Sequence, residues 1–225
     1  MILYNLFPTP VLRVPADPDT YDSIQIEIRD AIHKIEEEQT YSDVTYLYKK
    51  NNLSLSNKTY NFISNFNCDK LKDRIKYAAI EYIKQIKWGG QWVQDDLLIN
   101  IKNSWLNIIE SGDNHGQHCH PGYSISGVYY YRIEPSMGSI SFNNPNPLMF
   151  SCSFPQGHSS PQHSFISPNR GDIILFPSWL VHSTIKNKTE EDRISVAFNI
   201  DLENLVSENV YGLVKGTHMP FIKYE

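Results

Sequence analysis

Hydrophobic positions recur at helical spacing in two stretches of the first third of the chain. The first stretch covers residues 20–38, and its apolar stripe consists of Ile24, Ile28, Ile32 and Ile35. The second covers residues 69–86, with a stripe of Leu71, Ile75, Ala79 and Ile83. Residues three or four positions apart lie on one face of an α-helix, so each stretch is predicted to be an amphipathic helix that packs this face on a core. The polar, Asn-rich connection at residues 51–61 is predicted to be a loop or short strands.

The pattern changes near Trp88, where short β-rich runs begin to alternate with Gly, Pro, Asn and Ser. The predicted strands cover residues 97–110, 123–134, 138–142, 163–167, 172–176, 182–186 and 193–201. Many short strands with turn residues between them are typical of a sandwich or barrel. We therefore predict a mainly β protein with flanking helices, in which a double-stranded β-helix (jelly roll) is braced on one outer face by the N-terminal α-helices.

The length of 225 residues favours a single domain. Within residues 1–225 we expect helical support at residues 1–90, the jelly-roll core at 91–202 and a C-terminal extension at 203–225. Gly89-Gly90 is predicted to be a hinge between helix and sheet, not a domain linker.

Composition narrows the classes of function. The net charge of −5 argues against a nucleic-acid partner, because neutralising phosphates requires a basic surface. The three cysteines, Cys68, Cys119 and Cys152, are odd in number and scattered, which does not suggest a disulfide framework. The N-terminal stretch has no basic region, and no apolar run is long enough to cross a bilayer, so no membrane association and a cytoplasmic location are expected.

The segment HGQHCHPGYSISGVYYY at residues 115–131 contains a pair of candidate metal ligands. His118 and His120 lie two residues apart, next to a predicted strand. In an extended chain such residues project from the same face, while Cys119 between them points away. Two imidazoles on one face can share a metal ion, although a single pair of this kind is a weak signal.

A later segment strengthens the metal hypothesis. His182 follows a predicted buried strand, and in a jelly roll it can fold back beside His118. Three ligands from two distant segments would leave one face of the ion open, as a catalytic metal requires. Arg193 begins the next strand and can enter the same cavity, where a guanidinium is suited to binding a carboxylate through two hydrogen bonds. Ser195 faces the same way and can donate a further hydrogen bond.

These residues resemble those of the 2-oxoglutarate-dependent Fe(II) oxygenases, in particular small prolyl-hydroxylase-like members of bacterial and phage type. The matching stretches are FPTP at 7–10, Trp105, HCHPGYSISGVYYY at 118–131, GDIILFPSWLVH at 171–182 and RISVAFN at 193–199. The resemblance covers roughly the last 120 residues and is thin before Trp88. It implies an enzyme that uses Fe(II), 2-oxoglutarate and O₂ to hydroxylate a substrate, with release of succinate and CO₂.

The resemblance also implies roles for individual residues. His118, His120 and His182 would bind iron, and Arg193 with Ser195 would bind the far carboxylate of 2-oxoglutarate. Tyr129 and Asn107 are further candidates for binding the cosubstrate. Side chains alternate between the two faces of a strand, and this leaves open which of the tyrosines at 129–131 faces the cavity. The prime substrate is unidentified, and the kinship to prolyl hydroxylases makes a peptidyl proline the first candidate.

Most of the superfamily has a carboxylate where this chain has His120. Either His120 is a direct ligand, or it lies behind the ligands and Glu110 or Asp113 supplies an acid. Two alternatives for the whole protein also remain open. One is a three-histidine zinc hydrolase or hydratase, and the other is a non-catalytic jelly-roll protein that binds a metal or another ligand.

The other candidate residues are interpreted as structural. His115 lies in a Gly-Asp-Asn turn context and is expected to be a loop residue, and Trp105 is expected to pack in the core. The remaining histidines, His33, His158, His163 and His218, carry no assigned chemistry.

Overall fold

The computed structural model describes residues 9–37, 61–86, 97–146 and 162–204. Both predicted amphipathic helices are present, as α1 (Tyr21–Glu37) and α4 (Asp69–Ile86). Their predicted apolar stripes are largely buried, with Ile28, Leu71 and Ile75 fully excluded from solvent. A short helix α3 (Phe62–Asn65) and a 3-10 turn η2 (Pro135–Met137) complete the helical elements of the described residues.

The strands form two antiparallel sheets. The larger sheet has the order β1-β6-β3-β8-β2 and the smaller sheet has the order β5-β4-β7. The strands are β1 (Leu12–Val14), β2 (Leu97–Ile109), β3 (Ile125–Arg132), β4 (Ile140–Asn143), β5 (His163–Ile166), β6 (Ile173–Pro177), β7 (His182–Thr184) and β8 (Arg193–Asn204). All seven predicted strands are present, and the predicted jelly-roll class is confirmed.

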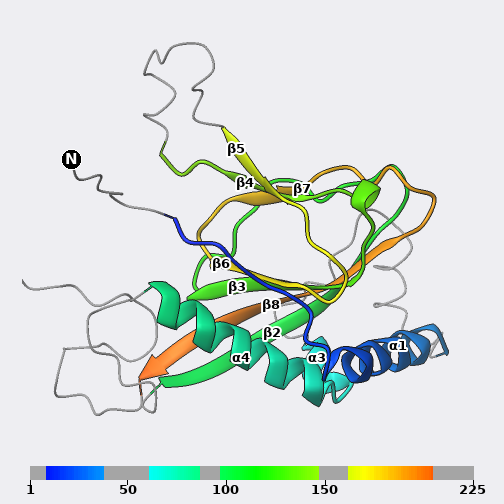
Figure 1. Cartoon of the computed structure of the whole chain (residues 1–225), viewed down its shortest axis with the longest axis horizontal. Coiled ribbons are helices and arrows are strands. Elements are labelled where there is room, and N and C mark those ends of the chain that lie inside the picture. The colour runs from blue at the N-terminus through cyan, green and yellow to red at the C-terminus, as the bar shows by residue number, and fades with distance from the viewer. Residues whose placement is uncertain (1–8, 38–60, 87–96, 147–161, 205–225) are drawn as a thin grey trace, which may run out of the picture.

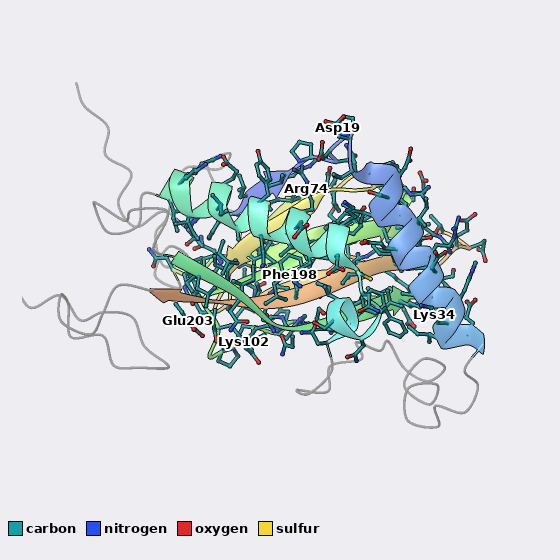
Figure 2. All side chains as sticks on the ribbon, turned by 90° about the horizontal axis from the view of Figure 1, so that it is seen from below. Asp19, Lys34, Arg74, Lys102, Phe198 and Glu203 are labelled. Atoms are coloured by element: carbon teal, nitrogen blue, oxygen red, sulfur yellow. The ribbon has the colours of Figure 1, made fainter. Side chains whose placement is uncertain are left out.

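The helices cover one face of the larger sheet, and the smaller sheet lies over its other face (Figure 1). The largest apolar core lies between the helices and the larger sheet, where Ile28 and Leu71 belong to the same cluster as Phe198 of β8. Figure 2 looks at this arrangement from the helical side, with α1 and α4 lying across the strands. The predicted bracing of one outer face is therefore confirmed.

A second apolar cluster lies between the two sheets. Its members come from both sheets and their connections: Tyr130, Ile133, Met137, Ile140, Phe142, Ile174, Phe176 and Leu180. This packing holds the two sheets together. Beside the cluster, the inner face of the larger sheet, which is the face toward the smaller sheet, carries polar side chains. A cavity lies there between the sheets, and it contains the candidate site.

Two short elements were not predicted. Strand β1 has only three residues and is joined to the larger sheet by pairing with β6, where Arg13 Nε also donates to Asp172 Oδ2 at 2.6 Å. Helix α3 begins after Asn61, whose side chain accepts hydrogen bonds from Ser64 N and from Ser104 Oγ. Both elements are too short for a periodic pattern, so their positions follow from tertiary partners.

Some predicted boundaries lie outside the described residues. The Gly89-Gly90 hinge falls there, as does nearly all of the connection at 51–61 and of the C-terminal extension. Strand β8 continues to Asn204, two residues past the expected end of the core. No helix among the described residues has the length and apolar character needed to span a membrane.

Candidate active site

Backbone pairing brings two distant segments together beside the cavity. His118 N donates to His182 O at 3.0 Å, and His182 N donates to His118 O at 2.9 Å. On either side, Thr184 N donates to His115 O and His120 N donates to Ser178 O. Residues 115–120 therefore run antiparallel to residues 178–184, which places their histidines side by side.

The three predicted metal ligands form one cluster. One ligand nitrogen from each of His118, His120 and His182 lies within 4.8 Å of the other two. Nitrogens bound to a single ion at about 2.1 Å are at most about 4.2 Å apart, so the cluster has nearly the size that one ion needs. Cys119 is exposed, as expected for the residue between them. The prediction that these imidazoles meet is confirmed.

Two of the imidazoles are oriented by backbone carbonyls. His118 Nδ1 lies 2.8 Å from Gly116 O, and His182 Nδ1 lies 2.9 Å from Leu180 O. A carbonyl oxygen only accepts, so each Nδ1 carries the proton in these hydrogen bonds and each Nε2 keeps its lone pair. Metal-binding histidines generally use their second nitrogen in this way, which fixes both the tautomer and the ring direction.

No carboxylate joins the histidines. Glu110 is exposed and Asp113 is half-buried. Within the part of the chain that the structure describes, the group of side chains able to hold a metal consists of His118, His120 and His182. His120 therefore takes the place expected for the third ligand, with its ring 5.4 Å from the ring of Trp105.

Burial favours the neutral form of three histidines at the site, His182, His120 and His115. Desolvation lowers the pKa of His182 to about 3, and it lowers the pKa values of His120 and His115 to about 4. The neighbouring His118 acts in the same direction by charge repulsion. A metal ion binds only the neutral imidazole, so the site is ready to accept one at neutral pH.

The lowered pKa values predict acid sensitivity of the metal-free protein. Histidines of the unfolded chain, with a pKa of about 6.5, take up protons before His182, His120 and His115 do in the folded protein. The free energy of unfolding should therefore decrease as the pH falls from about 6.5 to about 4. Urea unfolding over this range measures the slope, which His182→Asn should reduce and His33→Asn, on the exposed side of α1, should not. Identical slopes in all three proteins would contradict this prediction.

Polar side chains from three neighbouring strands form the cavity floor. Ser195 of β8 lies directly between Asn107 of β2 and Tyr130 of β3, so the three share the inner face of the larger sheet. Two residues further along β8, Arg193 lies opposite Ile109 and shares this face. Asn107, Tyr130, Arg193 and Ser195 all line the same cavity as the three histidines.

Arg193 is a buried cation that has no acidic partner among the described residues. It is 3% exposed, and its Nη1 donates to Gly138 O at 3.3 Å. Gly138 has a φ of 92°, and a Cβ there would lie 2.1 Å from Ile185 O, so only glycine presents its carbonyl in this way. Burial lowers the pKa of Arg193, yet a guanidinium stays charged in proteins. A buried charge without a counter-charge is costly, which indicates that an anion binds here.

The unsatisfied polar atoms of the structure gather in this one cavity. Among the described residues, four buried side-chain atoms have no hydrogen-bond partner: Trp105 Nε1, Asn107 Oδ1, Tyr130 Oη and Arg193 Nε. All four residues line the cavity that the histidines border. Buried polar atoms in proteins are nearly always paired, so this concentration indicates a polar, anionic ligand beside the metal site. The carboxylates and keto group of 2-oxoglutarate accept hydrogen bonds, so they fit the three donors among these atoms, Trp105 Nε1, Tyr130 Oη and Arg193 Nε.

The structure corrects one predicted cosubstrate contact. Tyr129 lies opposite Val196 on the helix-facing side of the larger sheet, and its hydroxyl accepts a hydrogen bond from Gln25 Nε2 of α1 at 2.9 Å. Tyr130 points to the other side and lines the cavity. Burial raises the pKa of Tyr130 to about 12, so its hydroxyl remains a donor at neutral pH.

Two residues that were predicted to be structural also line the cavity. His115 lies outside the strands, as predicted, and its ring stacks on that of His118 with centroids 4.2 Å apart. Trp105 belongs to the buried core, as predicted, and it also lines the cavity with an unpaired N–H. The spacing His115-X-X-His118 was the available signal, but it has no meaning until the pairing with Thr184 is known.

The remaining histidines lie elsewhere or outside the described residues. His33 is exposed on α1, and His163 on β5 pairs with Asn143 Oδ1 at 3.0 Å. His158 and His218 fall outside the described residues.

Comparison with known proteins supports the chemistry inferred from the cavity. Residues 103–199 match a family model described as "Putative 2OG-Fe(II) oxygenase". This stretch begins in β2 and ends in β8, and it contains all three histidines, Arg193 and Ser195. A search of the curated proteins gave no match.

Two solved structures with a TM-score above 0.5 agree with this chain in fold. The chain is similar to SnoK, a non-heme α-ketoglutarate-dependent carbocyclase from nogalamycin biosynthesis, at 7% identity and a TM-score of 0.54, covering 96% of this chain and 90% of that one. It is also similar to SnoN, an α-ketoglutarate-dependent epimerase from the same biosynthesis, at 14% identity and a TM-score of 0.52, covering 96% and 89%. A 2OG-Fe(II) oxygenase-family oxidoreductase from Burkholderia pseudomallei matches at 17% identity and a TM-score of 0.36, over 46% of this chain and 45% of that one.

The sequence match and the cavity lead to one assignment. The matched residues are those that build the jelly-roll core, and the donor set in that core suits the iron and the keto acid after which the matched family is named. Over residues 103–199 the chain is therefore similar to the 2OG-Fe(II) oxygenases.

Proposed function

We propose that this protein is a non-haem oxygenase that uses Fe(II), 2-oxoglutarate and O₂ to hydroxylate an unidentified substrate, with release of succinate and CO₂. The observation that carries the proposal is the meeting, in one cavity, of three clustered histidines and a buried arginine that has no acidic partner among the described residues. A metal site alone would not require the arginine, and an anion site alone would not require the histidines.

Three histidines would hold the iron. His118, His120 and His182 approach from two segments on one side, which leaves positions open for small ligands. Bound iron supplies the activation of O₂ and the oxidation of the substrate, while the protein supplies position and a cavity shielded from water. Because all three ligands are neutral, the ion keeps its full positive charge, and doubly anionic 2-oxoglutarate would offset that charge.

The far carboxylate of 2-oxoglutarate would bind to the floor of the cavity. Arg193 offers the charge and the planar pair of N–H groups that suit a carboxylate, and Ser195 and Tyr130 offer hydroxyl donors nearby. Asn107 lies opposite Ser195 and has an unpaired amide oxygen. Since amide orientation is assigned from hydrogen bonding, the reversed amide would direct its N–H₂ to the same ligand.

Tyr130→Phe should have opposite effects on the free protein and on the complex. In the free protein the variant removes a buried hydroxyl that has no partner, so the free energy of unfolding should stay equal or rise by up to about 1 kcal/mol. The affinity for 2-oxoglutarate should fall about threefold to tenfold, because a donor to the carboxylate is lost. Urea unfolding and calorimetric titration measure the two effects, and Tyr129→Phe serves as the control that spares the cavity. A loss of stability with unchanged affinity would place Tyr130 outside the binding site.

Hydroxylation of a peptidyl proline is the first candidate reaction, on the resemblance to small prolyl hydroxylases. The fold alone supports several outcomes, since the similar structures include an enzyme described as an epimerase and one described as a carbocyclase. The test is succinate formation by the Fe(II)-loaded protein with proline-containing peptides and with small-molecule pools, followed by mass analysis. A product that gains one oxygen atom supports hydroxylation. Succinate formed with a product of unchanged composition or with loss of hydrogen would contradict it and favour the other outcomes.

A zinc hydrolase is the second candidate, because the same three ligands suit Zn²⁺ as well as Fe(II). It gives no role to the unpaired Arg193 or to the Tyr130 hydroxyl. Hydrolysis by the zinc-loaded protein that is insensitive to 2-oxoglutarate would favour this candidate over the oxygenase.

A further inference from the structure

His115 is a fourth histidine at the site and is separate from the three-histidine metal cluster. Its ring stacks on the ring of His118, with centroids 4.2 Å apart and planes 29° apart. The metal-holding group of the described residues does not include it. It nevertheless lines the same cavity as His118, His182 and Arg193.

The backbone fixes the position of this ring. His115 N donates to Thr184 Oγ1 at 2.7 Å, and His115 O accepts from Thr184 N at 3.0 Å. Residue 115 is therefore tied on both sides to strand β7, which also carries His182. A residue held only as part of a loose turn would not need this double anchor, so the ring is presented to the cavity at a defined place.

The ring of His115 lies beside the metal cluster. It contacts the ring of His118 and lines the cavity that Arg193 also lines. An ion held by His118 at about 2 Å would lie within about 6 Å of a ring stacked on that histidine. Atoms bound to the open face of the ion can therefore come within hydrogen-bonding distance of a His115 nitrogen.

We propose that His115 is a cosubstrate-binding residue whose imidazole N–H donates a hydrogen bond to the keto-acid end of 2-oxoglutarate, beside the metal. The inference rests on the proposed function. Arg193, Ser195 and Tyr130 occupy the part of the cavity assigned to the far carboxylate. The keto-acid end is the part of the ligand that remains next to His118, and the imidazole of His115 offers it an N–H donor.

The rival explanation is that His115 only packs against His118 and holds it in place. Two variants separate the explanations. His115→Phe keeps an aromatic ring for stacking and lacks the N–H, whereas His115→Gln loses the ring and keeps an N–H donor. If His115 only supports His118, the phenylalanine should substitute well and the glutamine poorly, and metal affinity should follow the same order.

The experiment measures 2-oxoglutarate binding by calorimetry on Mn(II)-loaded protein, without turnover. His115→Phe should raise the dissociation constant about fivefold to tenfold, His115→Gln should stay within about threefold of the wild type, and the Mn(II) affinity of both should change little. The same series with 2-oxopentanoate, which has a methyl group in place of the far carboxylate, locates the contact. His115→Phe should raise the dissociation constant of 2-oxopentanoate by the same factor. Arg193→Ala should leave that constant unchanged, because this ligand has no far carboxylate.

Each alternative outcome has a distinct meaning. Wild-type affinity for 2-oxoglutarate in His115→Phe, together with a large loss in Arg193→Ala, would overturn the role of His115 and leave the proposed function standing. An equal loss in His115→Phe and His115→Gln, or a parallel loss of Mn(II) affinity, would also overturn it. Failure of the wild-type protein to bind 2-oxoglutarate at all would overturn the proposed function itself.

Discussion

His182→Ala should lose Fe(II) binding and all turnover that depends on it. His182 is 5% exposed. Its ring centroid lies 4.6 Å from that of Phe176, and its ring also contacts the rings of His118 and His120. Two remaining histidines would hold the ion much less tightly, and we expect the affinity to fall at least about 100-fold. Anaerobic Fe(II) titration of the purified protein measures this loss.

Two further variants make the result specific to the metal. His120→Asp should retain Fe(II) binding, because it introduces the carboxylate that most of the superfamily has at this position. His33→Ala removes an exposed histidine of α1 and should bind as the wild type does. If His182→Ala is folded, as judged by circular dichroism, and still binds Fe(II) with wild-type affinity, the shared metal site does not exist.

Arg193→Ala should retain the metal and lose the cosubstrate. The variant leaves the far carboxylate of 2-oxoglutarate buried without its charged partner, so the affinity should fall by more than about 100-fold. Arg193→Lys keeps a positive charge but cannot reproduce the planar pair of donors, and a fall of about tenfold to 100-fold is expected. Calorimetry on the Mn(II)-loaded protein gives both values.

The Arg193 result also separates the candidate functions. Arg132→Ala is the matched control, because Arg132 lies exposed on the neighbouring strand β3. Metal affinity should be similar in all four proteins, since Arg193 belongs to the cavity floor and not to the ligand cluster. Equal 2-oxoglutarate affinity in the wild type and in Arg193→Ala would contradict the oxygenase proposal and leave the zinc candidate.

The strands and the metal ligands could be predicted because their signals are local. Amphipathic spacing defined α1 and α4, and turn residues between short apolar runs defined the strands to within a few residues. The histidines were predictable because a strand directs His118 and His120 to one side, and because a jelly roll can bring His182 back to them. The antiparallel bridge between His118 and His182 realises that expectation.

The choice between Tyr129 and Tyr130 was not predictable, for a physical reason. Strand β3 is covered by helices on one face and by the smaller sheet on the other, so both faces are buried. Alternation then shows that neighbouring tyrosines point to opposite sides, but hydrophobicity does not tell which side is the cavity. Only the register, with Tyr130 opposite Ser195, decides.

The role of His115 depends on long-range pairing as well. The residue lies outside the strands, in a segment with glycine next to it, and no periodic pattern assigns its direction. Its place follows from hydrogen bonds with Thr184, which is far away in the sequence. The same holds for β1, whose three residues become a strand only because β6 pairs with them.

The most direct test of the account is an anaerobic absorption titration of the wild-type protein with Fe(II) and then with 2-oxoglutarate. Chelation of Fe(II) by a keto acid is expected to produce a weak absorption band at about 500 nm. We expect this band to appear only when both Fe(II) and 2-oxoglutarate are present. His182→Ala should never show it, and Arg193→Ala should require far more 2-oxoglutarate. Absence of the band at any concentration of 2-oxoglutarate, in wild-type protein that has bound Fe(II), would contradict the assignment of the cavity to this cosubstrate.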